Sequence, residues 1–136
     1  MMTFGLTLAV CLIGSRIPDW IDSGGRPGHR GFGHSLLSLV LFMIVTLLLS
    51  SLFVDQGLAL LYAVALAAGY FSHLALDFVT YEGVPWFWPL DEKYSLDLGP
   101  AGGLLVGFLG LLALVLSIYL LADRFLVTIV LLPGAG

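Results

Sequence analysis

The stretch SLLSLVLFMIVTLLLSSLFV, residues 35 to 54, is twenty positions long and carries no charge. A helix needs about 20 such residues to cross the hydrocarbon core of a bilayer, so the stretch predicts a transmembrane helix. Residues 58 to 78 and residues 103 to 122 are similar in length and composition. The first of these two is interrupted only by His73 and Asp77 near its end. Three full spans are therefore expected.

The apolar stretch at the N-terminus, from about residue 3 to residue 14, is too short for a full crossing. No basic segment precedes it and no small-x-small cleavage site follows, so we expect a retained, short or tilted helix rather than a signal peptide. The expected fold is all-α, a polytopic membrane bundle of three full transmembrane helices plus this short N-terminal helix. No linker or repeat divides the chain, which favours a single integral membrane domain over residues 1 to 136.

Composition supports a membrane protein and excludes a nucleic-acid binder. Hydrophobic residues make up 60% of the chain and charged residues 10%, and the mean hydropathy is +1.07. The formal charge is -4 and only five Lys and Arg are present, too few to neutralise a phosphate backbone. The lone Cys11 lies in an apolar run and says nothing firm about redox compartment. The expected surroundings are therefore a lipid bilayer.

The short connection at residues 55 to 57 makes its flanking helices antiparallel neighbours. Alternation along the chain then places the loops 15 to 34 and 79 to 102 on one membrane face. Four basic residues lie on that face and one on the other, namely Arg16, Arg26, Arg30 and Lys93 against Arg124. Because Lys and Arg bias sets orientation, we expect the polar loops to be cytoplasmic, at a prokaryotic inner membrane.

The same face carries six side chains of metal-ligand type: Asp19, Asp22, His29, His34, His73 and Asp77. His73 and Asp77 are four residues apart, so both lie on one face of a helix. A structural histidine–carboxylate hydrogen bond explains that pair in isolation about as well as a metal does. The convergence of all six favours one divalent site with supporting carboxylates, or two metals sharing a carboxylate. Thiolates are absent from the set, which favours Zn, with Mn as a second choice.

Several neighbours of these ligands have two interpretations each. Arg30 can hold a phosphate oxygen beside the ion, or only fix topology. Asp22 or Asp77 can act as a general base. Ser35 can cap the helix that follows it or touch substrate. The aromatic segment VPWFWPL, residues 84 to 90, is most simply interpreted as an aromatic belt at the membrane interface. It can also line a groove for a lipid substrate.

Four stretches in order, IPDWID, HRGFGHS, GYFSHLALDFVTYEGVP and WFWPL, cover roughly residues 14 to 92. Together they resemble the YdjM-like family of LexA-regulated, inner-membrane-bound, predicted metal-dependent hydrolases. The resemblance implies a metal-assisted hydrolase with phosphoester substrates, and its suggested ligands are Asp19, His29, His34, His73 and Asp77. Two positions depart from the family pattern: Gly33 stands where the family has Thr, and Asp22 is one place later than its counterpart.

Three functions fit these features. The first is hydrolysis of a phosphoester or lipid-linked substrate, such as a phospholipid or a polyprenyl phosphate, at the cytoplasmic face, with Asp22 and Arg30 as candidate catalytic residues. The second is metal carriage or sensing, because intramembrane His and Asp also line ion pathways. A monomeric pore is disfavoured, since no charge lies deep in the other spans. The third is a structural subunit without a metal.

Overall fold

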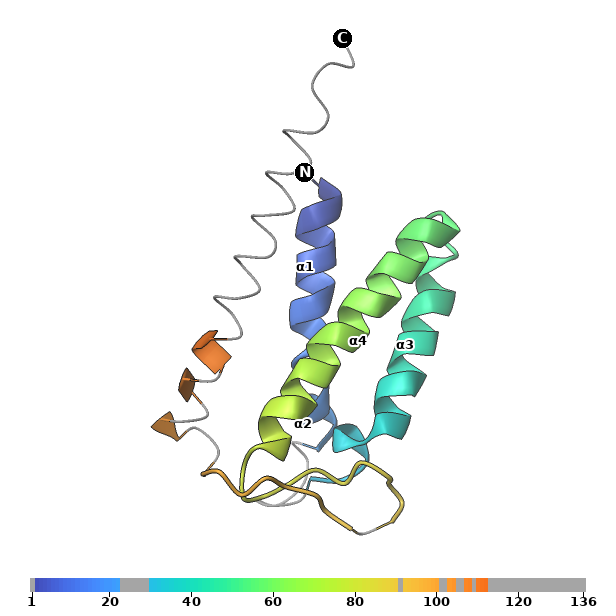
Figure 1. Cartoon of the computed structure of the whole chain (residues 1–136). Helices are drawn as coiled ribbons and strands as arrows, with labels where there is room; N and C mark the ends of the chain where they lie inside the picture. The colour runs from blue at the N-terminus through green and yellow to red at the C-terminus, as the bar shows by residue number, and fades with distance from the viewer. Residues whose placement is uncertain are drawn as a thin grey trace. The chain divides into compact units, whose positions relative to one another are not determined.

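The computed structural model of the chain describes residues 2–22, 30–90, 92–100, 103–104, 107–108 and 110–112. The chain divides into two compact units, residues 1–101 and 102–136. The first unit contains α1 (Met2–Gly14), α2 (Ile17–Asp22), the 3-10 helix η1 (Phe32–His34), α3 (Leu36–Ser50) and α4 (Gln56–Phe78). Within the described residues only isolated β-bridges occur, and no strand. The expected helical class is confirmed (Figure 1).

Helix α4 packs against both α1 and α3. Its approach to α1 is set by glycines, because a Cβ on Gly69 would overlap the carbonyl oxygen of Cys11, and one on Gly14 would overlap that of Leu66. Small residues of this kind let helix backbones come close in a membrane, where van der Waals packing replaces the hydrophobic drive. The two helices therefore meet backbone to backbone.

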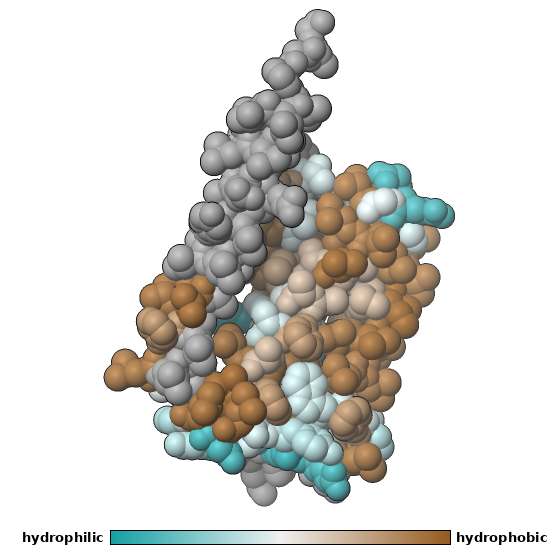
Figure 2. Space-filling model, viewed as in Figure 1, coloured by the Kyte–Doolittle hydropathy of each residue, from teal (hydrophilic) through white to brown (hydrophobic). Residues whose placement is uncertain are grey.

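Helices α3 and α4 form the expected antiparallel hairpin. The Asp55 carboxylate accepts a hydrogen bond from the Leu58 backbone N–H and so caps α4 at its start. The Ser35 hydroxyl accepts one from the Ser38 N–H at the start of α3, which confirms Ser35 as a helix cap. The exposed faces of both helices are strongly apolar, as Figure 2 shows in brown.

Two of the expected spans are corrected. Helix α3 has 15 residues, not twenty, because the chain leaves the helix at Ser51 and turns before Asp55. At 1.5 Å per residue it is about 22 Å long, less than the hydrocarbon thickness of about 30 Å. The N-terminal helix α1 ends at Gly14 as expected, but together with α2 it forms a helical stretch of 20 residues, Thr3–Asp22.

Two helical segments, Thr3–Asp22 and Gln56–Phe78, are thus long and apolar enough to cross a membrane. The third full span, expected at residues 103 to 122, lies mostly outside the described residues.

The segment IPDWID, which was expected to be a loop, forms α2. Pro18 lies in its first turn, where a missing N–H breaks no helical hydrogen bond. Figure 1 shows α2, η1, the start of α3 and the end of α4 together at one end of the unit, below the α3–α4 turn in this view. The expected sharing of one end by the two polar loops is confirmed for their described residues. We call this the polar end.

Candidate metal centre

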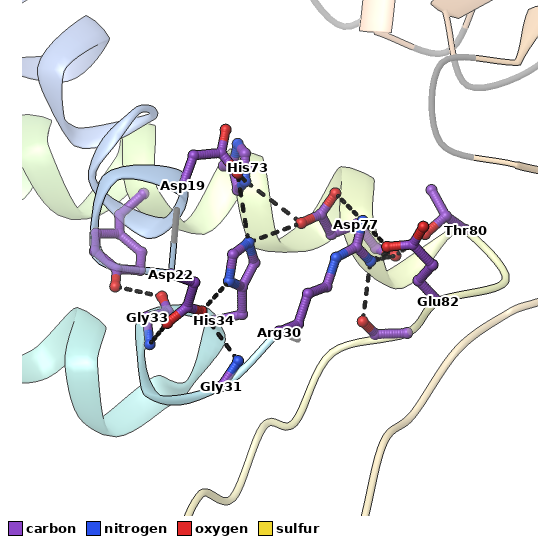
Figure 3. A network of polar contacts seen from close by, with 12 residues as sticks. Asp19, Asp22, Arg30, Gly31, Gly33, His34, His73, Asp77, Thr80 and Glu82 are labelled. Atoms are coloured by element: carbon purple, nitrogen blue, oxygen red, sulfur yellow. Dashed lines mark hydrogen bonds and ion pairs between the residues drawn. The ribbon is translucent and has the colours of Figure 1, made fainter. Parts of the chain in front are cut away.

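Three segments far apart in the sequence bring their side chains together at the polar end (Figure 3). Asp19 comes from α2, His34 from η1, and His73 and Asp77 from the last turns of α4. The rings of His34 and His73 lie with centroids 5.5 Å apart. The i, i+4 spacing of His73 and Asp77 places both on one face of α4, as the sequence predicted.

Imidazole nitrogens and carboxylate oxygens alternate around a common point. Asp77 Oδ2 lies 3.2 Å from His34 Nε2 and 3.4 Å from His73 Nε2. On the other side, Asp19 Oδ1 lies 3.4 Å from His73 Nε2 and 3.7 Å from His34 Nε2. The ligand atoms of Asp19, His34 and His73 all fall within 4.8 Å of one another, close enough to hold one metal ion.

The cluster is buried on one side and open on the other. The His34 side chain is 4% exposed and that of His73 20%, whereas the Asp19 side chain is 54% exposed. Asp19 therefore lies on the accessible side of the cluster.

Asp22 lies on the opposite edge of the His34 ring. Its Oδ2 is 2.6 Å from His34 Nδ1, and its two oxygens accept hydrogen bonds from the backbone N–H groups of Gly31 and Gly33. A carboxylate that holds Nδ1–H in this way fixes the ring and leaves Nε2 free for an ion. The geometry therefore favours Asp22 as an orienting residue for His34, rather than as a ligand of the same ion.

The electrostatic setting of His34 is dominated by its carboxylate neighbours. Burial works to lower the pKa of the imidazole, but hydrogen bonds and charge attraction from Asp77 and Asp22 outweigh it. The pKa of His34 therefore lies above its ordinary value of 6.5 in the metal-free protein. Carboxylates gathered around an imidazole favour a cation at the ring, either a proton or a metal ion.

Arg30 holds the other oxygen of Asp77. Its Nη2 lies 2.9 Å from Asp77 Oδ1 and 3.4 Å from a Glu82 oxygen. Its Nη1 donates to the Asp77 carbonyl, to Thr80 Oγ1 and to the Gly83 carbonyl. The guanidinium is thus engaged by protein groups, which favours Arg30 as the residue that positions Asp77. Its expected contact with a substrate phosphate stays a prediction.

A buried polar network under η1 was missed by sequence reasoning. The Tyr70 hydroxyl donates to the Gly33 carbonyl at 2.5 Å and lies 2.6 Å from the Ser38 hydroxyl. Tyr70 and Ser38 are both fully buried. The sequence feature that could have revealed this network is a hydroxyl on each of two neighbouring apolar helices, Ser38 and Tyr70. Hydroxyl groups within a membrane span usually form hydrogen bonds with a partner. This network holds η1, and hence His34, against α4.

The residues fit a divalent metal. His73 Nε2 is buried and has no hydrogen-bond partner within the described residues, although it faces two carboxylate oxygens at 3.4 Å. Two ligand atoms about 2.1 Å from one ion, at about the tetrahedral angle, stand about 3.4 Å apart. Of the other expected ligands, Asp22 lies as described, and His29 lies outside the described residues together with Arg26.

A family model, the YdjM inner membrane protein, matches residues 3–133. No curated protein and no solved structure matches the chain. The match spans almost the whole sequence, including every residue of the cluster.

Proposed function

Because this chain belongs to the YdjM inner membrane protein family, we propose that it is a membrane-embedded, metal-dependent hydrolase with its centre at the polar end. The observation that carries the proposal is His73 Nε2, a buried nitrogen with no hydrogen-bond partner within the described residues, aimed at the point where His34 and two carboxylates converge. Leaving such a group without a partner is costly, and a metal ion at this point would satisfy it.

Asp19, His34 and His73 would hold the ion, and two imidazoles with carboxylates favour Zn over Mn. When bound, such an ion polarises a phosphoryl or acyl oxygen and lowers the pKa of a water towards neutrality. Asp77 Oδ2 is close to both Nε2 atoms and can complete the ligand set or accept a proton, while Arg30 fixes its orientation. Asp22 keeps Nε2 of His34 facing the centre.

The place of the cluster favours a substrate held at the membrane. It lies at the end of the apolar helix α4 and opens on the side of Asp19. A phosphoester on a lipid anchor, such as a phospholipid or a polyprenyl phosphate, reaches such a centre without leaving the bilayer. The excess of Lys and Arg on the loops of this end favours the cytoplasmic face.

The test is metal analysis of the purified full chain beside His73→Ala and Asp77→Asn. Wild type is expected to carry about one divalent ion per chain and His73→Ala to lose most of it. Asp77→Asn is expected to lose the ion if Asp77 completes the ligand set, and to keep it if Asp77 only accepts a proton. Glu92→Gln is the matched control, because Glu92 is an exposed carboxylate that accepts a hydrogen bond from the Tyr94 hydroxyl and is not part of the cluster, so this variant should keep full occupancy.

The same samples are then assayed on a panel of phosphomonoesters, phosphodiesters, phospholipids and polyprenyl phosphates. Turnover that is lost with a chelator and restored by Zn supports hydrolysis. Metal bound without turnover on any of these classes would instead favour a metal carrier or sensor, and equal metal content in all variants would leave a structural protein.

A further inference from the structure

The segment that follows α4 is organised although it contains no strand in its described residues. Thr80 pairs with Gly99 and Val84 with Tyr94 in isolated β-bridges. Tyr81 N–H donates to the Gly99 carbonyl, and Val84 and Tyr94 exchange two backbone hydrogen bonds. We call residues 80–90 and 92–99 the aromatic loop. It is a closed loop that begins two residues after the last residue of α4.

The aromatic loop exposes large apolar side chains at the end of the unit that holds the charged cluster. Seven of them are substantially exposed: Tyr81, Phe87, Trp88, Leu90, Tyr94, Leu96 and Leu98. Leu90, for example, is 62% exposed. In water a loop with this content would be an aggregation hazard, so the exposure points to an apolar or amphipathic partner.

The loop is fixed to the rest of the unit from within. Val84 is fully buried, and Trp86 packs on Phe78 with ring centroids 5.7 Å apart. The Trp86 carbonyl accepts a hydrogen bond from Leu36 N–H at the start of α3, and Trp88 packs edge-on against Phe32 of η1 at 5.2 Å. The loop is therefore packed against the rest of the unit, and its exposed side chains do not result from a loop without packing contacts.

The same loop is tied to the metal centre. Arg30, which holds Asp77, also binds Thr80 Oγ1, the Gly83 carbonyl and the Glu82 carboxylate. One guanidinium thus joins the first residues of the loop to a candidate ligand. The position of the loop and the position of the centre are fixed by one set of hydrogen bonds.

We propose that the aromatic loop lies in the interfacial layer of the bilayer, with its exposed side chains in contact with lipid headgroups and the first part of the acyl chains. The loop is continuous with α4, which is apolar and long enough to cross a membrane. Trp and Tyr concentrate at the membrane interface because their rings are apolar and their N–H or O–H groups still reach water. The continuity of the loop with α4 and its aromatic composition thus both favour lipid as the partner.

The consequence is that the loop sets the depth of the metal centre. With the loop among the headgroups, the link through Arg30 holds Asp77 beside the layer in which the ester bonds and phosphates of lipids lie. Contact between the loop and lipid can be tested without any measurement of metal or turnover.

The test uses the chain's three tryptophans, Trp20, Trp86 and Trp88. A Trp88-only chain (Trp20→Phe with Trp86→Phe) and a Trp86-only chain (Trp20→Phe with Trp88→Phe) are placed in lipid nanodiscs. Quenching is measured with iodide in the buffer, with lipids labelled by a nitroxide near the headgroup, and with lipids labelled near the chain end. Trp88 is expected to be shielded from iodide several-fold and quenched most by the headgroup label.

Trp86, which packs against the core, is expected to respond several-fold less to the headgroup label than Trp88. Free access of iodide to Trp88 would overturn the proposal, because the loop would then lie in water. Shielding of Trp88 from iodide and from both lipid labels would also overturn it, since protein would cover the loop instead.

A second measurement leaves every tryptophan in place. Leu96→Cys in a Cys11→Ala background is labelled with a fluorophore whose emission reports polarity, with Glu92→Cys as the control on the same loop. The Leu96 label is expected to shift to shorter wavelength in nanodiscs and the Glu92 label to stay close to its emission in water. Equal emission from both labels would contradict lipid contact.

Discussion

The chain holds its N-terminal helices against α4 by two kinds of contact. At the crossing of α1 and α4, Gly69 lies against the Cys11 backbone with no room for a side chain. One turn further along the same face of α4, His73 faces Asp19 of α2 across 3.4 Å. The first contact is apolar backbone packing, and the second joins ionisable side chains. The crossing therefore sets the gap between α2 and α4 in which the candidate metal centre lies.

This arrangement separates helix packing from the candidate metal centre along one face of α4. Close packing at glycine supplies van der Waals contact, which stabilises helix pairs in a membrane. The cluster instead concentrates carboxylates on two imidazoles, which costs stability unless a cation joins them. Changes at the crossing should therefore unfold the unit, and changes at the cluster should alter metal affinity first.

The largest expected effect is at the crossing. Gly69→Ala should lower the free energy of unfolding by about 3 kcal/mol, near the top of the range for overpacking, because both clashing groups are backbone. Metal occupancy should fall with it, since the gap between Asp19 and His73 widens. Thermal unfolding in detergent, followed by circular dichroism, measures the first and metal analysis the second.

The matched control is Gly5→Ala in α1, where an added Cβ meets nothing within 4 Å. Alanine there should be neutral or stabilise the helix by up to about 1 kcal/mol. If Gly69→Ala unfolds at the temperature of wild type, close glycine contact does not hold α1 against α4.

The second effect separates the cluster from the crossing. Asp22→Asn should weaken metal affinity by about 10–100-fold, the range seen when a group that orients a ligand is lost. Helix content should stay as in wild type, because Asp22 lies away from the α1–α4 contact. Titration with a divalent metal and a competing chelator measures the affinity. Unchanged affinity with lost turnover would instead make Asp22 a reacting group, as the sequence first suggested.

The third effect is a pH dependence with opposite signs in the two metal states. The folded pKa of His34 is raised by Asp77 and Asp22 against the effect of burial, so its protonated form stabilises the metal-free fold. That stability is complete below the ordinary pKa of 6.5 and is lost as the pH rises through the raised value. Metal binding needs the neutral ring, so below the raised pKa the affinity should fall up to about tenfold per pH unit.

Unfolding temperatures across this pH range, with and without Zn, check both signs. The metal-free chain should lose stability towards higher pH, and the stabilisation by Zn should grow. A stabilisation by Zn that is the same at every pH would show that the metal does not compete with the proton at His34.

Much of this organisation could be predicted from the sequence because it follows from local spacing. The long apolar runs predicted helices, and the short turn at residues 55 to 57 predicted antiparallel neighbours. The spacing of His73 and Asp77 predicted that both lie on one helix face. Alternation of loops was enough to place Asp19 and His34 at the same end as His73 and Asp77. These inferences need only helix geometry and the solvent preferences of side chains.

The remainder depends on tertiary contacts that no spacing encodes. Hydropathy alone extended α3 past Ser51, because the turn residues there are as apolar as the helix. Hydropathy also missed α2, which continues the helical stretch of α1 although it contains two aspartates. Asp19 and Asp22 are three residues apart, but Asp19 is a candidate ligand and Asp22 orients His34. This difference depends on which edge of the His34 ring each carboxylate faces. Only the fold of residues 31–34 decides that.

The smallest expected effects compare the two ends of the α3–α4 hairpin by means of their helix caps. Asp55→Ala and Ser35→Ala each remove a side chain that accepts one backbone N–H, at a cost of about 1 kcal/mol in both cases. The cap at Asp55 is far from the cluster, so metal affinity should not change. Ser35 directly follows His34 and also donates to the Phe32 carbonyl, so its loss should loosen η1 and lower metal affinity several-fold. Equal metal affinity in the two variants would mean that η1 is held by the Tyr70 network alone.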